Sequence, residues 1–162
     1  MRDYFIRRVR YEELDSCADV IRRSFDTVAK EFGLTAENCP TNGAFLKTER
    51  LVAEMNQGAY LYGLYCTGAL IGFMGLKDKG EGAFELEKLA VLPAYRHNGG
   101  GGKLLAYACG EAANMGANRI QIGIIEENTR LKAWYVNHGF AHTGTACFAH
   151  LPFTVGFMEK KL

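Results

Sequence analysis

Four consecutive glycines, residues 99–102, stand between a β-rich run and a stretch with helical spacing. Glycine weakens a helix interior, and the chain contains 19 glycines in 162 residues, about 12% against an average near 7%. The first N–H groups of a helix have no partner within the helix, and bare backbone lets an anion approach them without meeting Cβ atoms. This unit of strand, glycine turn and helix predicts an α/β chain with an anion site at the turn.

The charge balance of the chain requires that such a site be local. Nineteen Lys and Arg residues stand against 18 Asp and Glu residues, which gives a formal net charge of +1. A chain of this kind has no overall field that would hold a nucleic acid or an anionic membrane surface. We therefore expect no nucleic-acid partner and no membrane partner.

The spacing of apolar residues and turn residues predicts seven strands and four helices. The expected strands cover residues 4–9, 59–66, 69–76, 83–91, 119–125, 140–148 and 153–158, and residues 77–82 are expected to form a loop. The expected helices cover residues 11–30, 41 or 42 to 57, 101–115 and 128–138. From residue 59 onward, only two strand-to-strand connections pass through a helix, which favours a mixed sheet over a doubly wound one. The length suits a single domain over residues 1–162.

Three kinds of phosphate-binding turn use a glycine-rich entrance to a helix. A P-loop requires G-x-x-x-x-G-K followed by Ser or Thr, whereas Gly102 and Lys103 are followed by Leu104. A dinucleotide-binding turn requires G-x-G-x-x-G, and Leu104 occupies its third glycine position. The third pattern, R-x-x-G-x-G, is satisfied by Arg96, Gly99 and Gly101. The turn therefore fits this third pattern best.

Two blocks of sequence resemble the GNAT superfamily of acyl-CoA-dependent N-acetyltransferases. The first contains the strand end at residues 89–91, Pro93, Tyr95 and the R-x-x-G-x-G turn. The second, residues 128–140, is similar to the family's helix and following strand, N-x-x-A/K-x-x-x-Y-x-x-x-G-F. Gly100 departs from the family, which usually has an aliphatic residue there. The resemblance implies an α/β fold with a mixed, mostly antiparallel sheet of six to seven strands, a central splayed parallel pair, and about four flanking helices.

The resemblance also implies acetyl-CoA as cosubstrate and assigns residues to it. The turn would hold the pyrophosphate, and the preceding strand would pair with the pantetheine arm. Asn128, the natural N-cap of the helix in the second block, would touch pantetheine. The cofactor-binding residues expected on this basis are Leu89, Ala90, Val91, Arg96, His97, Asn98, Gly99, Gly100, Gly101, Gly102, Lys103, Asn128 and Lys132.

Acetyl transfer to an amine requires a base, because an alkylammonium group with a pKa near 10.4 is protonated at pH 7. Glu85 and Glu87 lie two residues apart on one strand face, and the family takes its base, direct or through water, from this strand. From the residues alone, a solvated acidic strand face or salt bridges near Lys88 would be the favoured explanation, and the choice between the two carboxyl groups stays open. No Cys or Ser stands in either motif to support an acetyl-enzyme route.

Tyr135 matches the tyrosine that protonates the departing thiolate in many relatives. A tyrosine pKa near 10 and a thiol pKa near 8.5 make this proton transfer feasible without extreme tuning. The alternative is that Trp134 and Tyr135 are aromatic core on a short helix. The expected function is therefore direct transfer of an acetyl group from acetyl-CoA to a primary amine of a small molecule or peptide. The runner-up is a non-catalytic acyl-CoA-binding or sensing domain.

The remaining expectations concern surroundings and partners. His150, between the last two strands, borders the acceptor pocket in the family and is a candidate substrate contact. His138 and His142 are separated by the helix breaker Gly139, so no metal site is expected. Five widely spaced cysteines without a C-x-x-C pair, and no secretory signal at the N-terminus, predict a cytoplasmic protein. The resemblance also allows a homodimer.

Overall fold

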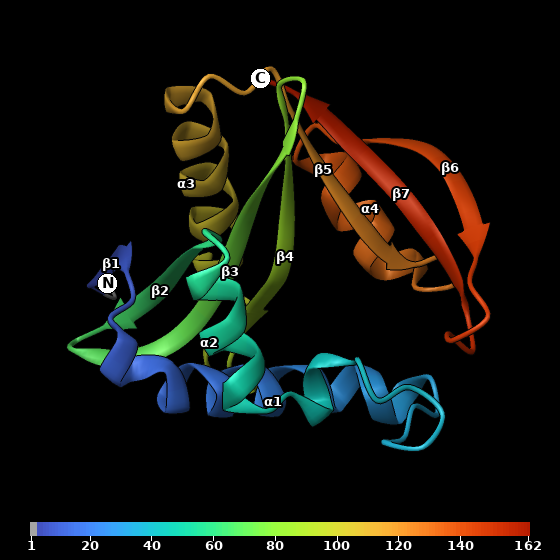
Figure 1. Ribbon diagram of the computed structural model, residues 1–162, viewed down its shortest axis with the longest axis horizontal. Helices are drawn as coiled ribbons and strands as arrows, with labels where there is room; N and C mark the ends of the chain where they lie inside the picture. The colour runs from blue at the N-terminus through green and yellow to red at the C-terminus, as the bar shows by residue number, and fades with distance from the viewer. Residues whose placement is uncertain (1–2) are drawn as a thin grey trace.

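The computed structural model describes residues 3–162 and contains one mixed sheet flanked by helices (Figure 1). Within these residues, seven strands follow the order β1-β2-β3-β4-β5-β7-β6. The strands are β1 (Tyr4–Arg8), β2 (Tyr60–Cys66), β3 (Ala69–Gly80), β4 (Ala83–Val91), β5 (Arg119–Ile125), β6 (Ala141–Cys147) and β7 (Thr154–Lys161). The helices are α1 (Leu14–Glu31), α2 (Thr48–Asn56), α3 (Gly100–Asn114) and α4 (Thr129–Asn137). The expected fold class is confirmed.

The parallel pair lies in the middle of the sheet. Among the described strands, β4 and β5 are the only parallel neighbours, and α3 makes the crossover between them. All other neighbouring strands are antiparallel. Strand β7 lies between β5 and β6. Figure 1 shows β4 and β5 close together near the β3–β4 hairpin and apart at their other ends.

Helices cover both faces of the sheet and bury an apolar cluster on each. On one face, Leu104 of α3 belongs to a cluster with Leu64 of β2. On the other, Ile21 of α1 belongs to a cluster with Phe73 of β3. Burying one such side chain contributes about 1.5–3 kcal/mol, so packing from both sides fixes the central strands. Within residues 3–162, every helix is too short or too polar to traverse a bilayer.

The second helix is shorter than predicted. We predicted a helix from residue 41 or 42 to 57, but α2 begins only at Thr48. Asn42 acts as a cap, as expected, but of the 3-10 turn Gly43–Phe45, where its side chain accepts a hydrogen bond from the Ala44 N–H (2.9 Å). Leu46 then takes an extended conformation (φ −63°, ψ 134°) and its side chain is buried. Burial of this leucine separates the turn from the helix.

Strand β3 is longer than predicted. Residues 77–82 were expected to form a loop, but β3 continues to Gly80, with Lys77 opposite Glu85 of β4. The turn consists of Glu81 and Gly82, both with positive φ (55° and 80°). Strand pairing uses backbone groups, so charged side chains are tolerated where one strand face is exposed. The extension carries Lys77 to a position beside the acidic face of β4.

Candidate active site

The two parallel strands pair over three residues and then separate. Residues 83–85 of β4 lie opposite residues 119–121 of β5, and β5 continues its pairing with β7 as far as Ile125. No strand within residues 3–162 pairs with this side of β4 beyond Glu85. Figure 1 shows the resulting divergence. The backbone groups on this side of β4, including those of Leu89, Ala90 and Val91, are therefore available to a ligand that adds as a strand.

A bulge interrupts β4 just before these residues. Phe73 of β3 lies opposite Ala90, and Gly75 lies opposite Glu87, so that the single residue Met74 faces both Lys88 and Leu89. Lys88 has a φ of +53°, a left-handed conformation that costs an L-residue about 1–2 kcal/mol. The extra residue turns the last part of β4 and sets the direction of its free edge.

The glycine turn follows β4 and presents backbone N–H groups. His97 and Gly99 both have positive φ (64° and 83°), and α3 begins directly afterwards at Gly100. No side chain caps α3, and the first intrahelical bond runs from the Lys103 N–H to the Gly99 carbonyl (3.1 Å). The N–H groups before Lys103 thus stand at the positive end of the helix dipole, which is the arrangement that an anion requires.

The Arg96 side chain braces the turn from behind. We expected Arg96 to bind the cofactor, but its guanidinium group binds α1 and the end of β4. Its Nε donates to the Val91 carbonyl (3.2 Å), its Nη1 to the Thr27 hydroxyl (3.0 Å) and its Nη2 to the Ser24 carbonyl (2.5 Å). Asn98 donates to the Arg96 carbonyl (3.0 Å). These side chains stabilise the shape of the turn and leave its backbone to face a ligand.

Packing accounts for one of the two glycines in the turn that the R-x-x-G-x-G pattern does not require. A Cβ atom on Gly100 would lie 3.0 Å from Cδ2 of Leu64 on β2, which is tighter than van der Waals contact allows. A Cβ atom on Gly102 would lie 3.4 Å from Nε2 of His138 on α4, an ordinary van der Waals distance, so packing does not require glycine there. The first turn of α3 is therefore held between the sheet and α4. Gly100 departs from the family pattern because Leu64 fills the space that a side chain would occupy.

Helix α4 lies against this turn and carries Tyr135. The Tyr135 ring packs on those of Trp134 (5.0 Å between centroids) and Phe140 (5.2 Å), and the residue is 5% exposed. Burial raises the pKa of its hydroxyl above the usual value of 10. The hydroxyl is therefore a weaker acid than the sequence suggested. It keeps its proton across the physiological pH range.

Two further residues of the second block have defined partners. Asn128 caps α4, its side chain accepting a hydrogen bond from the Leu131 N–H (3.2 Å), as predicted. The Lys132 ammonium pairs with Glu126, which also binds Nε2 of His142 (2.9 Å). Lys132 is thus engaged with a carboxylate next to the end of β5.

Glu85 and Glu87 form a coupled pair on the face of β4 opposite α3. A hydrogen bond joins their carboxyl groups. Burial, that hydrogen bond and the charge of Glu87 raise the pKa of Glu85 from 4.5 to about 7. Burial also acts to raise the pKa of Glu87, but the hydrogen bond from Glu85 and the ammonium groups of Lys88 and Lys77 lower it to about 2. The pair therefore shares one proton below neutral pH, and Glu85 is the member that titrates near pH 7.

Sequence reasoning missed the cations around this pair and the acid behind them. Lys77 lies 3.0 Å from Glu87, and Lys88 lies 3.3 Å from Glu87 and 2.8 Å from Glu54 of α2. The adjacent polar residues Glu87 and Lys88 break the apolar alternation of the strand, and this break was the available signal for the bulge. Glu54 stands three residues after the buried Leu51 of α2, at a position where helical spacing predicts an apolar side chain.

The loop that carries His150 lies at the far end of β5. Leu151 and Phe153 pack on a cluster that includes Cys39, from the α1–α2 connection, and Ile125. His150 itself is exposed, and its ring lies 5.9 Å from that of Phe148. Two loops distant in sequence therefore meet near the diverging end of β5. Residues 3–162 contain no group of three or more His, Cys, Asp or Glu side chains that could hold a metal ion.

Comparisons with known proteins agree with this geometry. The sequence model of the Acetyltransferase (GNAT) family matches residues 26–140. An uncharacterized N-acetyltransferase of Mycobacterium tuberculosis is 32% identical over 81 residues, which is 50% of this chain and 52% of that protein. The chain thus spans about half the length of this curated relative.

Solved structures share the fold over nearly the whole chain. PaiA N-acetyltransferase from Thermoplasma acidophilum, in complex with coenzyme A, has a TM-score of 0.76 at 22% identity and covers 99% of each chain. The YncA protein of Salmonella typhimurium, with acetyl-CoA, has a TM-score of 0.72 at 19% identity, over 98% of this chain and 94% of its own. At these identities the likeness is one of fold.

Proposed function

Because the chain belongs to the GNAT acetyltransferase family, we propose that it transfers an acetyl group from acetyl-CoA to a primary amine of a small molecule or peptide. The observation that carries this proposal is the divergence of β4 and β5 beside an uncapped, glycine-rich helix N-terminus. In the proposed complex the pyrophosphate binds the N–H groups of the turn, and pantetheine pairs with the free edge of Leu89, Ala90 and Val91. Gly100 allows α3 to approach this edge closely.

We assign the base to Glu85. The acceptor reaches the site as an ammonium ion, and Glu85, with its pKa near 7, takes a proton directly or through water. The amine nitrogen then attacks the acetyl carbonyl carbon, so that a C–N bond forms and the C–S bond breaks. Glu87 stays ionised beside Lys77 and Lys88 and keeps the pKa of Glu85 raised. This division of roles separates the two carboxyl groups that the sequence left equivalent.

Tyr135 serves the leaving group. Its hydroxyl keeps its proton because burial raises its pKa, and it donates a hydrogen bond to the sulfur as negative charge develops there. The proton follows when the thiolate departs, which yields coenzyme A with a free thiol. The attacking nitrogen loses its second proton to solvent as the amide forms, Tyr135 regains a proton from solvent, and Glu85 releases the one taken from the ammonium ion, so that one proton is released per turnover.

The acceptor entrance, the extent of the domain, its location and its oligomeric state are also proposals. The meeting of the α1–α2 connection with the loop between β6 and β7 supports an acceptor entrance there, with His150 as a contact. We retain residues 1–162 as one acetyltransferase domain, a cytoplasmic location and a homodimer as predictions. Size-exclusion chromatography coupled to light scattering tests the last of these.

The proposed function is tested by thiol release. The protein is incubated with acetyl-CoA and a panel of primary amines (amino acids, diamines, amino sugars and short peptides), and free coenzyme A is detected by a thiol reagent. Gly101→Glu places a carboxylate in the anion site and is expected to abolish binding and turnover. Gly110→Glu, on the same helix but facing open space, is the charge-matched control.

Each outcome of this test has a defined meaning. Binding of acetyl-CoA with thiol release for at least one amine supports the proposal. Binding without release for any amine favours the acyl-CoA-binding domain over the enzyme. Absence of binding by the wild-type protein contradicts the proposed function.

A further inference from the structure

A buried acid on α2 pairs with the lysine of the β4 bulge. Glu54 is 6% exposed, and both of its carboxylate oxygens lie 2.8 Å from Nζ of Lys88. Nε of Arg50 (3.4 Å) and Nζ of Lys77 (3.9 Å) lie nearby. Taking a carboxylate out of water is unfavourable unless cations compensate it, so this position is occupied at a cost in folding free energy.

Lys88 connects this acid to the backbone of the candidate active site. Its side chain is 9% exposed, and its ammonium group bridges Glu54 on α2 and Glu87 on β4. Its backbone is the left-handed residue of the bulge, next to Leu89 at the start of the free edge. The left-handed conformation is unfavourable for lysine, and the buried ion pair offsets this cost in free energy.

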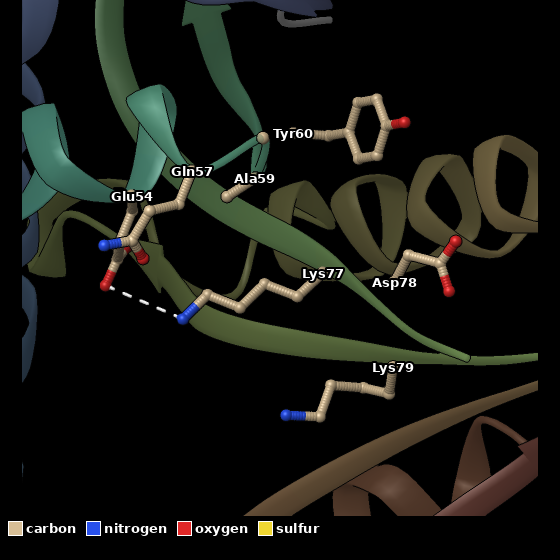
Figure 2. A pocket seen from close by; sticks show the side chains of 8 residues that line it. Glu54, Gln57, Ala59, Tyr60, Lys77, Asp78 and Lys79 are labelled. Carbon is tan, nitrogen blue, oxygen red and sulfur yellow. Dashed lines mark ion pairs between the residues drawn. The ribbon is translucent and has the colours of Figure 1, made fainter.

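The cluster of Glu54, Lys77, Glu87 and Lys88 borders an opening on the surface. Glu54, Lys77 and Lys79 contribute to the lining of a pocket of about 240 Å³ between the end of α2 and β3. Figure 2 shows the Glu54 carboxylate directed towards the Lys77 ammonium group across this pocket. Helix α2 therefore reaches the bulge through charged groups, whereas the rest of its buried face packs on apolar side chains.

We propose that Glu54 is a positioning residue, whose ion pair with Lys88 holds the β4 bulge in the conformation that presents the free edge of Leu89, Ala90 and Val91 to the pantetheine arm. The inference rests on the proposed function. Glu54 does not touch the cofactor, and it acts through the backbone of Lys88. Loss of the ion pair lets the bulge relax and misaligns the edge, while the glycine turn keeps its own supports from Arg96 and α1.

The test compares two ligands that use different parts of the site. Acetyl-CoA requires both the turn and the strand edge, whereas adenosine 3′-phosphate 5′-diphosphate keeps the pyrophosphate for the turn and lacks the pantetheine arm. Calorimetry is expected to show that Glu54→Gln weakens acetyl-CoA binding about tenfold, the equivalent of one or two lost hydrogen bonds. Adenosine 3′-phosphate 5′-diphosphate is expected to bind the variant within about twofold of wild type, because its binding free energy contains no contribution from the strand edge.

Substitutions of Lys88 separate the backbone from the charge. Glycine adopts positive φ freely and alanine does not, and neither carries an ammonium group. Added to Glu54→Gln, Lys88→Gly is expected to restore acetyl-CoA affinity to within about threefold of wild type, because the bulge no longer needs the ion pair. Lys88→Ala in the same background is expected to restore nothing. If Glu54→Gln does not fold, the single variants Lys88→Gly and Lys88→Ala give the same comparison.

Several results overturn the inference. They are unchanged acetyl-CoA affinity in folded Glu54→Gln, equal weakening of both ligands, or equal affinities of the glycine and alanine variants. The failure of this inference differs from failure of the proposed function, which shows as absence of acetyl-CoA binding by the wild-type protein.

Discussion

Substitution of Glu85 by glutamine is expected to stabilise the protein at alkaline pH while removing the proposed base. Glutamine is neutral at every pH, and its amide donates to Glu87 as the protonated Glu85 does. The wild-type residue carries this proton only below its pKa of about 7. The charged groups that act on it are Glu87 on β4 and Lys79 and Lys77 on β3, and the uncharged Gln121 lies opposite on β5.

The sign follows from the direction of the pKa shift. Below pH 4.5, Glu85 is protonated in the folded and unfolded states alike, and it contributes no difference. Between pH 4.5 and about 7 the unfolded chain releases the proton while the folded chain retains it, so wild-type stability falls as pH rises. Without solvent screening, this pKa shift would lower the unfolding free energy by about 3 kcal/mol. Solvent access to the half-buried carboxyl reduces the effect to about 1–2 kcal/mol.

Thermal melts of both proteins across pH 4.5 to 9 measure the effect. For a chain of this size, about 1–2 kcal/mol corresponds to a rise of about 2–8 °C in Tm at pH 8, with no difference at pH 4.5. Turnover is expected to fall by at least about 100-fold, as for loss of a general base. A lower Tm for Glu85→Gln at pH 8, or the same Tm difference at both pH values, would refute the reasoning.

Three other substitutions test the remaining parts of the site. Gly99→Ala forces an L-residue to a φ of +83°, and it is expected to weaken acetyl-CoA binding about 5- to 30-fold in calorimetry. The control Gly110→Ala, within α3 and facing open space, is expected to leave the affinity unchanged. Tyr135→Phe is expected to lower turnover about 10- to 100-fold with acetyl-CoA affinity nearly intact, and unchanged turnover contradicts its role as acid. Arg96→Met removes three hydrogen bonds and is expected to lower the unfolding free energy by about 1–3 kcal/mol in denaturant titration; equal stability contradicts its bracing role.

Local patterns predicted the parts of the fold that depend on local chemistry. The strand, glycine turn and helix around residues 83–114 are confirmed. Pro93 and the glycines fix the end of the strand and the start of the helix through local backbone preferences alone. The end of β3 was missed because its charged side chains resemble a loop, and only its pairing with β4 makes it a strand. The start of α2 was misplaced because burial of Leu46, a tertiary effect, ends the helical turn early.

The candidate site was predictable only where it lies along one segment. Glu85 and Glu87 are two residues apart, so their shared face could be predicted from the strand period. Glu54 is 34 residues from Lys88, and no local spacing connects them. Arg96 was expected to point at the anion, but the Ser24 carbonyl, 72 residues away, draws its guanidinium group to α1. The catalytic and binding roles of these residues stay predictions until the variants are measured.

The brevity of the β4–β5 pairing has a mechanical consequence. Three residue pairs join one half of the sheet, β1 to β4, to the other, β5 to β7. Elsewhere the halves meet through side chains, such as those of Leu151 and Phe153 against the α1–α2 connection. Side-chain contacts slide more readily than a hydrogen-bonded ladder breaks, so the joint at residues 83–85 is a natural pivot. A cofactor bound along β4 would contact both halves and restrict their relative motion. Amide exchange in β5 and β7 is then expected to be slower in the cofactor-bound protein than in the free protein.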